Sequence, residues 1–143
     1  MTLNFDHLGR SIDTLERSLG YLDQTQRDAA DYDVFRHAVI KGFELTLETA
    51  GRLLRKALQE YGGSPKSVNE LVFKDVFRHA AKHGLMTGDE VERWIGYRDS
   101  RNDTAHDYGE AFATRVVGMV HHFIADARQL HRTLEARHGG PSA

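Results

Sequence analysis

The stretch FATRVVGMVHHFIADARQLHRTL, residues 112–134, decides the fold class of this chain. Its apolar residues recur every three or four positions, which is the pattern of a helix with one face against a bundle core. They are Phe112, Val116, Met119, Val120, Phe123, Ala127, Leu130 and Leu134. The stripe continues for about six turns at 3.6 residues per turn. We therefore expect a long helix after Gly109 that packs against other helices.

The same spacing predicts two long helices nearer the N-terminus. The first extends from about Phe5 to about Asp28, and the second extends from a capping residue at Asp33 to Tyr61. The sequence GGSP, residues 62–65, should end the second helix, because glycine suits the left-handed cap and proline cannot continue a helix. The two stripes are Phe5, Leu8, Ile12, Leu15, Leu19 and Leu22, then Phe35, Val39, Phe43, Leu47, Ala50, Leu54 and Ala57.

Two further helices are expected before residue 112. Ser67 with Glu70, and Thr87 with Glu90, have the capping-box spacing, in which each side chain bonds the other residue's backbone N–H. The third helix should end near Gly84. Its apolar residues, and then those of the fourth helix, are Val68, Leu71, Val72, Val76 and Ala80, then Val91, Trp94 and Ile95.

These segments predict an all-α fold, an up-and-down antiparallel bundle of four main helices plus a shorter one. No repeat or composition break divides the chain, so residues 1–143 should form one domain, with a frayed tail from about residue 137. Gly42, Gly51 and Gly118 each cost a helix about 1 kcal/mol relative to alanine, and we expect close helix approach to explain them. Long apolar stripes in a chain of this size also favour a homodimer.

Composition excludes several classes of site. The 143 residues include no cysteine, which removes disulfides, cysteine nucleophiles and cysteine zinc sites. The N-terminus has no signal-peptide core and no run is long enough to cross a membrane, so we expect a cytoplasmic protein with no membrane partner. The net charge of −2 disfavours binding of nucleic acid by bulk charge, so any RNA contact needs a local site.

The sequence RNDTAHDY, residues 101–108, contains the groups that metal-independent RNA cleavage requires. His106 can transfer protons near neutral pH, and Arg101 can neutralise charge that develops on a phosphate. Asn102, four residues before His106, can orient the imidazole, hold a phosphate oxygen or cap a helix. One His per chain is few for both acid and base roles, but a symmetric dimer would supply two.

A second interpretation of these residues involves no chemistry. Arg101 would form an ion pair with Asp99 or Asp103, Asn102 would cap a helix, and His106 would lie at the surface. Short motifs often occur by chance, so the residue types alone leave both interpretations open.

The motif resembles the signature of the HEPN family: an Arg, an Asn, three residues, a His, one residue and a Tyr before the last long helix. In particular, the chain resembles HepT toxins encoded beside minimal nucleotidyltransferases, and the related nucleotidyltransferase substrate-binding proteins. The resemblance is carried by FELTLETAGRLLRKAL, residues 43–58, and WIGYRDSRNDTAHDY, residues 94–108. It covers the chain from about Leu19 to Leu134.

The resemblance implies a dimeric endoribonuclease toxin that needs neither a metal nor another cofactor. Arg101 and His106 would be catalytic at the dimer cleft, with Asn102 in support. Tyr108 would be the residue to which the partner nucleotidyltransferase, the antitoxin, adds AMP, and this addition would block access of the RNA substrate.

Charges around the motif modify this expectation. Asp99, Asp103 and Asp107 flank it and should weaken the attraction of a phosphate. Arg98, one turn before Arg101, partly compensates and is a candidate RNA contact.

Two other functions fit the same residues. In the first, the chain is a non-catalytic dimeric module that binds a nucleotide or presents a substrate to its nucleotidyltransferase, and the Arg and His contact phosphate without cleavage. In the second, the chain is a purely structural helical dimer, in which a change in the motif affects stability alone.

Two further groups of residues are candidate sites. His79 and His83 have the i, i+4 spacing of a metal pair, but no third ligand accompanies them, so we expect a solvated helix face and no metal. A small basic patch either follows an RNA strand or is a solvated face, and its members are Arg52, Arg55 and Lys56.

Overall fold

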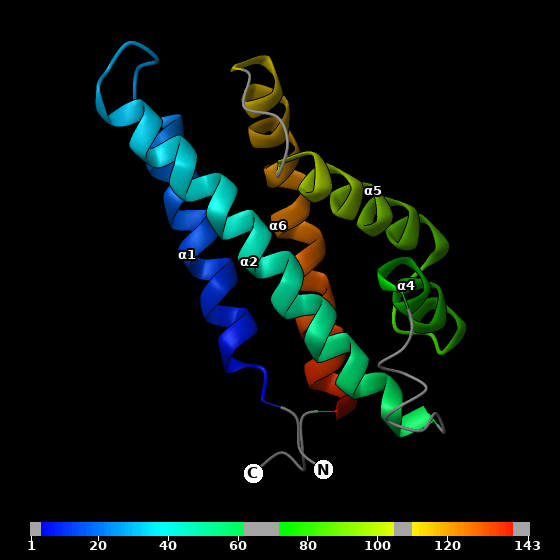
Figure 1. The fold of residues 1–143 in the computed structure, drawn as a ribbon. Coiled ribbons are helices and arrows are strands. Elements are labelled where there is room, and N and C mark those ends of the chain that lie inside the picture. The colour runs from blue at the N-terminus through cyan, green and yellow to red at the C-terminus, as the bar shows by residue number, and fades with distance from the viewer. Residues whose placement is uncertain (1–3, 62–71, 105–109, 139–143) are drawn as a thin grey trace.

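The computed structural model describes residues 4–61, 72–104 and 110–138, although the side chains of 102–104 and 110–113 lie outside that description (Figure 1). Within these ranges the chain is helical and has no strand, which confirms the predicted all-α class. The helices are α1 (Asp6–Asp23), α2 (Asp31–Leu58), the 3-10 turn η1 (Gln59–Tyr61), α4 (Phe73–Lys82), α5 (Gly88–Thr104) and α6 (Glu110–His138).

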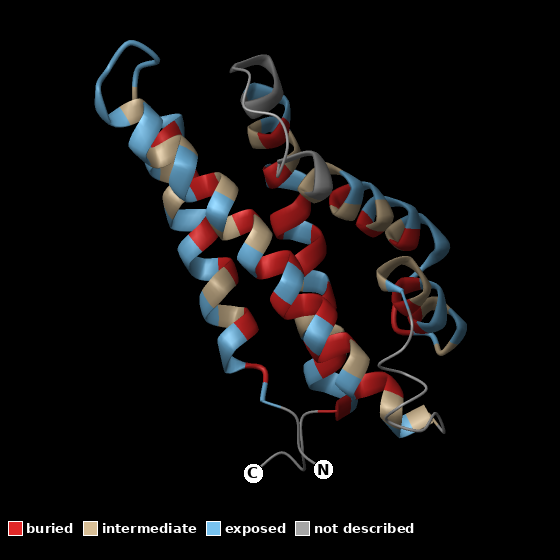
Figure 2. Cartoon of the chain, in the orientation of Figure 1, coloured by how far each residue is buried: buried red, intermediate tan, exposed pale blue. Residues whose placement is uncertain are grey.

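The core lies where α1, α2 and α6 pack together, and α5 lies obliquely beside them with α4 at its lower end (Figures 1 and 2). The predicted α1 stripe is buried throughout. In α2 every predicted residue from Val39 onward is buried, and Phe35 is partly buried against the core. In α6 the described stripe residues are buried except Met119, which is partly buried. The apolar periodicity therefore identified these core residues correctly. It was wrong for Val72, which precedes α4 in extended backbone and is 63% exposed.

The ends of the first two helices differ from the prediction. α1 ends at Asp23 rather than Asp28, since its apolar stripe stops at Leu22 and the Thr25 hydroxyl donates a hydrogen bond to the carbonyl of Tyr21. α2 begins at Asp31, so the prediction that Asp33 caps it is wrong. Asp33 lies within the first turn, where the helix dipole favours a carboxylate, and forms an ion pair with Arg36 at 3.1 Å.

The capping box at the start of α5 is confirmed. The backbone N–H of Thr87 donates to Glu90 at 3.0 Å, and the backbone N–H of Glu90 donates to the Thr87 hydroxyl at 3.1 Å. Gly84, two residues after the end of α4, has a φ of 76°, which glycine adopts without strain. The predicted stop at residues 62–65 and the predicted box at Ser67 and Glu70 lie outside the described residues.

An aromatic cluster attaches α5 to the rest of the bundle. Trp94 of α5 is fully buried, and its ring centroid lies 5.5 Å from that of Phe123 on α6 and 5.4 Å from that of Phe77 on α4. Phe123 also contacts Phe43 of α2 edge to face, at 4.9 Å between centroids. Tyr97 packs against Phe123 one turn farther along α5, at 5.0 Å. Four helices therefore meet at these rings.

A buried carboxylate reinforces this attachment. Asp126 of α6 accepts two hydrogen bonds from Arg93, at 2.8 and 3.0 Å, and a third from the hydroxyl of Tyr97. Burial, and then the bond to Asp126, raises the pKa of Tyr97. The bond to Asp126 raises the pKa of Arg93. The three residues form a satisfied polar network next to the rings.

Two of the three helix glycines allow close approach, as predicted. A Cβ at Gly42 would lie 3.1 Å from Leu15 Cδ1, and a Cβ at Gly51 would lie 2.6 Å from Phe73 Cε2. The prediction is wrong for Gly118, because a Cβ there would meet no atom of the described residues within 4 Å.

The first prediction concerns the buried carboxylate. Asp126→Asn should lower the free energy of unfolding by about 2–3 kcal/mol, because it weakens the bonds of Arg93 and Tyr97 at a buried position. Asp75→Asn, which breaks the exposed pair with Arg78, should change it by less than about 0.5 kcal/mol. Urea unfolding measures both values, and equal losses in the two variants would contradict the role given to Asp126.

The second prediction compares two glycines. Gly51→Ala should destabilise the fold by about 1–2 kcal/mol, because the new methyl group displaces the Phe73 ring. Gly118→Ala should stabilise it by up to about 1 kcal/mol, because a methyl group there meets open space. Thermal and urea unfolding test the opposite signs, and a stabilising Gly51→Ala would show that α2 and α4 can separate at no cost.

Candidate functional site

The structure describes the predicted motif only in part. Arg101 lies in the last turn of α5 and is partly buried. The backbone of Asn102 continues the same turn, but its side chain lies outside the description. His106 and Tyr108 both lie outside the described residues, so their roles stay predictions.

Arg98 lies one turn before Arg101 and is held by an aromatic ring. Its guanidinium carbon is 4.4 Å from the ring centroid of Phe73 on α4, which is the geometry of a cation–π contact. Phe73 is itself packed against Phe77 of the aromatic cluster, at 4.9 Å between centroids. The orientation of Arg98 therefore depends on the packing of α4 against α5.

Arg98 lies within electrostatic range of two other arginines, Arg101 on α5 and Arg55 on α2. Burial lowers the pKa of Arg98, and the positive charges of Arg101 and Arg55 lower it further. Glu48 acts in the opposite direction and raises it. The structure thus brings Arg55 and Glu48 of α2 to Arg98 and Arg101 of α5. We call Arg55, Arg98 and Arg101 the arginine cluster.

One of the acidic residues flanking the motif is paired elsewhere. Asp99 lies 3.3 Å from the Lys74 ammonium group on α4. Lys74 therefore offsets part of the Asp99 charge. The side chain of Asp103 and all of Asp107 lie outside the description.

The arginine cluster is suited to binding phosphate. Guanidinium groups stay protonated, and their planar N–H donors match pairs of phosphate oxygens. Mutual repulsion of the three cations is relieved when an anion binds between them. A charged group whose pKa is shifted by burial and by neighbouring charges, as that of Arg98 is, is a candidate for a functional site.

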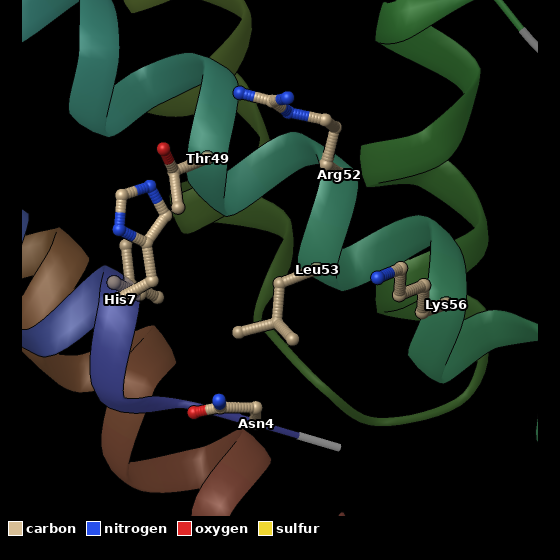
Figure 3. Close-up of a pocket in the computed structure, with 7 residues that line it drawn as sticks. Asn4, His7, Thr49, Arg52, Leu53 and Lys56 are labelled. Carbon is tan, nitrogen blue, oxygen red and sulfur yellow. The ribbon is translucent and has the colours of Figure 1, made fainter.

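Sequence reasoning missed two members of this arrangement. Arg55 was grouped with Arg52 and Lys56 as one patch, but the three residues face two different neighbours. Glu48 and Arg55 are seven residues apart, so they share the face of α2 that meets α5. Arg52 and Lys56, four apart, line a hollow against α1 instead (Figure 3). The helical period predicts that Glu48 and Arg55 share a face of α2, but only the packing shows that this face meets α5.

The histidine pair has a structural explanation. His79 is exposed, and the His83 ring stacks on Tyr61 with 4.5 Å between centroids. Across residues 4–61, 72–101 and 114–138, no three His, Cys, Asp or Glu side chains are grouped so that they could hold a metal. None of the described helices has the length and apolar character that a membrane span requires.

Comparison with known proteins gives the family. Residues 3–136 match the family model for nucleotidyltransferase substrate binding protein like proteins. A curated relative from Haemophilus influenzae, named probable ribonuclease HepT, is 30% identical over 105 residues, which is 73% of this chain and 70% of that protein.

Solved structures share the fold. A Haemophilus influenzae protein, described as having the fold of a substrate binding domain of a nucleotidyltransferase, has a TM-score of 0.79 and 24% identity, over 92% of this chain and 99% of that one. A tri-AMPylated Shewanella oneidensis HEPN toxin, solved in complex with an MNT antitoxin, has a TM-score of 0.54 and 21% identity, over 90% and 96% of the two chains. The matched family model and the curated relative show that this chain belongs to the family of HepT and the nucleotidyltransferase substrate-binding proteins.

Proposed function

We propose that this chain is a metal-independent endoribonuclease toxin of a HEPN and minimal-nucleotidyltransferase toxin–antitoxin pair that acts in the cytoplasm. The observation that carries the proposal is the arginine cluster, because it includes the first residue of the motif and gathers cations where a phosphate would bind. The relative named as a probable ribonuclease supports the reaction class.

The proposed reaction needs proton transfer and charge neutralisation. His106 takes the proton from a ribose 2′-hydroxyl, and the 2′-oxygen then attacks the adjacent phosphorus. The bond from phosphorus to the 5′-oxygen breaks, and a second His106, from the other copy in a dimer, protonates that leaving oxygen. The products are a 2′,3′-cyclic phosphate and a 5′-hydroxyl. Arg101 stabilises the charge that develops on the phosphoryl oxygens, and Asn102 orients the imidazole.

Arg98 has a separate role in this proposal. It contacts the RNA phosphate next to the one that is cleaved, while the ring of Phe73 keeps its guanidinium in place. Arg55 reaches the same region from α2. The cluster therefore binds the part of the substrate backbone that lies beside Arg98 and Arg55, next to the phosphate held by Arg101.

Regulation would follow from the same electrostatics. Tyr108 accepts AMP from the partner nucleotidyltransferase, and the added phosphate brings negative charge and bulk close to the motif. That charge would compete with RNA for the arginine cluster. The Shewanella oneidensis toxin, which carries AMP and is bound to an antitoxin of the MNT type, supports both the modification and the partner.

A second function is favoured by the family description. In this alternative the chain binds a nucleotide or presents a substrate to a nucleotidyltransferase, as the name of the matched family suggests. Arg98 and Arg101 would then hold phosphate groups without cleaving a bond.

The cleavage prediction separates the two functions. In excess EDTA the pure protein should cleave single-stranded RNA or tRNA, and His106→Ala and Arg101→Ala should each reduce the rate by about 100-fold or more. Labelled RNA resolved on a gel measures the rate, and circular dichroism checks that each variant is folded. If protein with unmodified Tyr108, confirmed by mass, cleaves no RNA, the binding function replaces the nuclease.

The modification prediction concerns Tyr108. After incubation with the cognate nucleotidyltransferase and ATP, the wild-type chain should gain the mass of one or more AMP groups and lose cleavage activity. Tyr108→Phe should keep its original mass and its activity, because it has no hydroxyl to accept AMP. Intact mass spectrometry decides the matter, and AMP found on Tyr108→Phe would assign the modification to another residue.

A further inference from the structure

A furrow follows the contact of α1 with α2 and consists of two adjoining hollows. The first, of about 260 Å³, lies at the start of α1 and is lined by Asn4, His7, Leu8, Thr49, Arg52, Leu53 and Lys56 (Figure 3). The second, of about 330 Å³, is lined by His7, Arg10, Ser11, Thr14, Gly42, Leu45 and Thr46. His7 lines both, so the two hollows adjoin at this residue. Along α2 they extend for about 21 Å at 1.5 Å per residue.

The lining of the furrow is cationic. It contains Arg10, Arg52 and Lys56 together with His7, and no aspartate or glutamate. This is notable in a chain whose acidic residues outnumber its lysines and arginines by 21 to 19. Figure 3 shows His7 of α1 beside Thr49 of α2, with Arg52 and Lys56 farther along α2. The side chains form a concave surface that suits an anion.

A hollow at the other end of α1 is lined by acidic residues rather than by arginine or lysine. It is lined by Glu16, Leu19, Gly20, Asp23, His121 and Ile124. In that place His121 lies 3.5 Å from the carboxylate of Asp23. The hollow at this end of α1 therefore differs in charge from the furrow at the other end.

The furrow cations are not explained by ion pairs within the described structure. Arg10, Arg52 and Lys56 are exposed and have no carboxylate partner among the described residues. Lys56 lies in the last turn of α2, where the helix dipole favours a positive charge. The dipole does not account for Arg10 or for His7, which belong to α1.

The furrow is next to the arginine cluster on α2. Arg55 acts on Arg98 of α5. It belongs to the same two turns of α2 as Arg52 and Lys56, which line the furrow. Cations on one stretch of α2 therefore face both α5 and α1. Glu48, one turn before Arg52, is a carboxylate on the same helix and lies near Arg98.

We propose that the furrow binds the phosphate backbone of single-stranded RNA as an extension of the cleavage site. The proposal rests on the proposed function, and it adds Arg10, Arg52, Lys56 and His7 as contacts to the substrate outside the motif. No aromatic ring other than the His7 imidazole lines either hollow, so base stacking is limited and binding follows the backbone rather than the sequence.

The test measures binding apart from cleavage. Fluorescence anisotropy of a labelled single-stranded RNA is followed as salt is raised, with the His106→Ala chain as the uncleaving background. Adding Arg52→Gln and Lys56→Gln should weaken binding by about tenfold at low salt. The plot of log affinity against log salt should become shallower by about 1.4, because each phosphate contact on a single strand contributes about 0.7.

A matched variant carries the same loss of charge outside the furrow. Arg17→Gln with Lys41→Gln removes one cation from α1 and one from α2, both exposed and in neither hollow. This pair should leave the affinity within about twofold and the salt dependence unchanged. Equal weakening by the two pairs would mean that overall charge alone binds RNA, and it would overturn the furrow.

The outcomes also distinguish the furrow from the nuclease itself. Cleavage by the wild-type chain together with unchanged RNA binding in Arg52→Gln/Lys56→Gln would overturn the furrow and leave the nuclease intact. Loss of binding in that variant, when the wild-type chain cuts no RNA, would keep the furrow and overturn cleavage. If Arg52→Gln/Lys56→Gln keeps its affinity for RNA but no longer binds the cognate nucleotidyltransferase, the furrow is a surface for that protein partner. This result would overturn the proposal.

Discussion

Packing of α5 on α6 is the constraint on which the candidate site depends. Trp94 and Tyr97 insert their rings against Phe123, and Asp126 holds Arg93 and Tyr97 by hydrogen bonds. Apolar burial supplies the free energy and the carboxylate fixes the rotation of the helix, because three directional bonds converge on one buried group. With α5 fixed in rotation, the face that carries Arg98 and Arg101 must turn toward α2.

Local charge matters more than net charge in this chain. The total of −2 predicts weak attraction of nucleic acid, yet α2 carries cations toward both α1 and α5. Screening limits each surface to a range of about 10 Å at ordinary ionic strength, so an RNA strand responds to the nearest cations rather than to the total. A small acidic protein can in this way contain a compact cationic surface.

The apolar periodicity predicted the helices well, because the positions of apolar residues along a helix depend mainly on which side faces the core. Each stripe follows from the geometry of one helix, so the residues that face the core can be read without knowing what they contact. The ends were less predictable. Asp33 has the chemistry of a cap, but the helix begins two residues earlier, and α1 stops five residues before its predicted end. Gly118 shows the same limit, because a glycine in a helix does not by itself indicate that another helix packs closely against it.

The sequence by itself determined the all-α class, most of the core residues, the capping box at Thr87 and Glu90, and the resemblance that identifies the family. It also placed the motif at the end of the fourth predicted helix, and the structure finds Arg101 in the last turn of α5. Tertiary structure alone decided that Arg55 approaches Arg98 while Arg52 and Lys56 turn toward α1. The physical reason is that helical spacing fixes which residues share a face, whereas the neighbour of that face depends on how the helices pack.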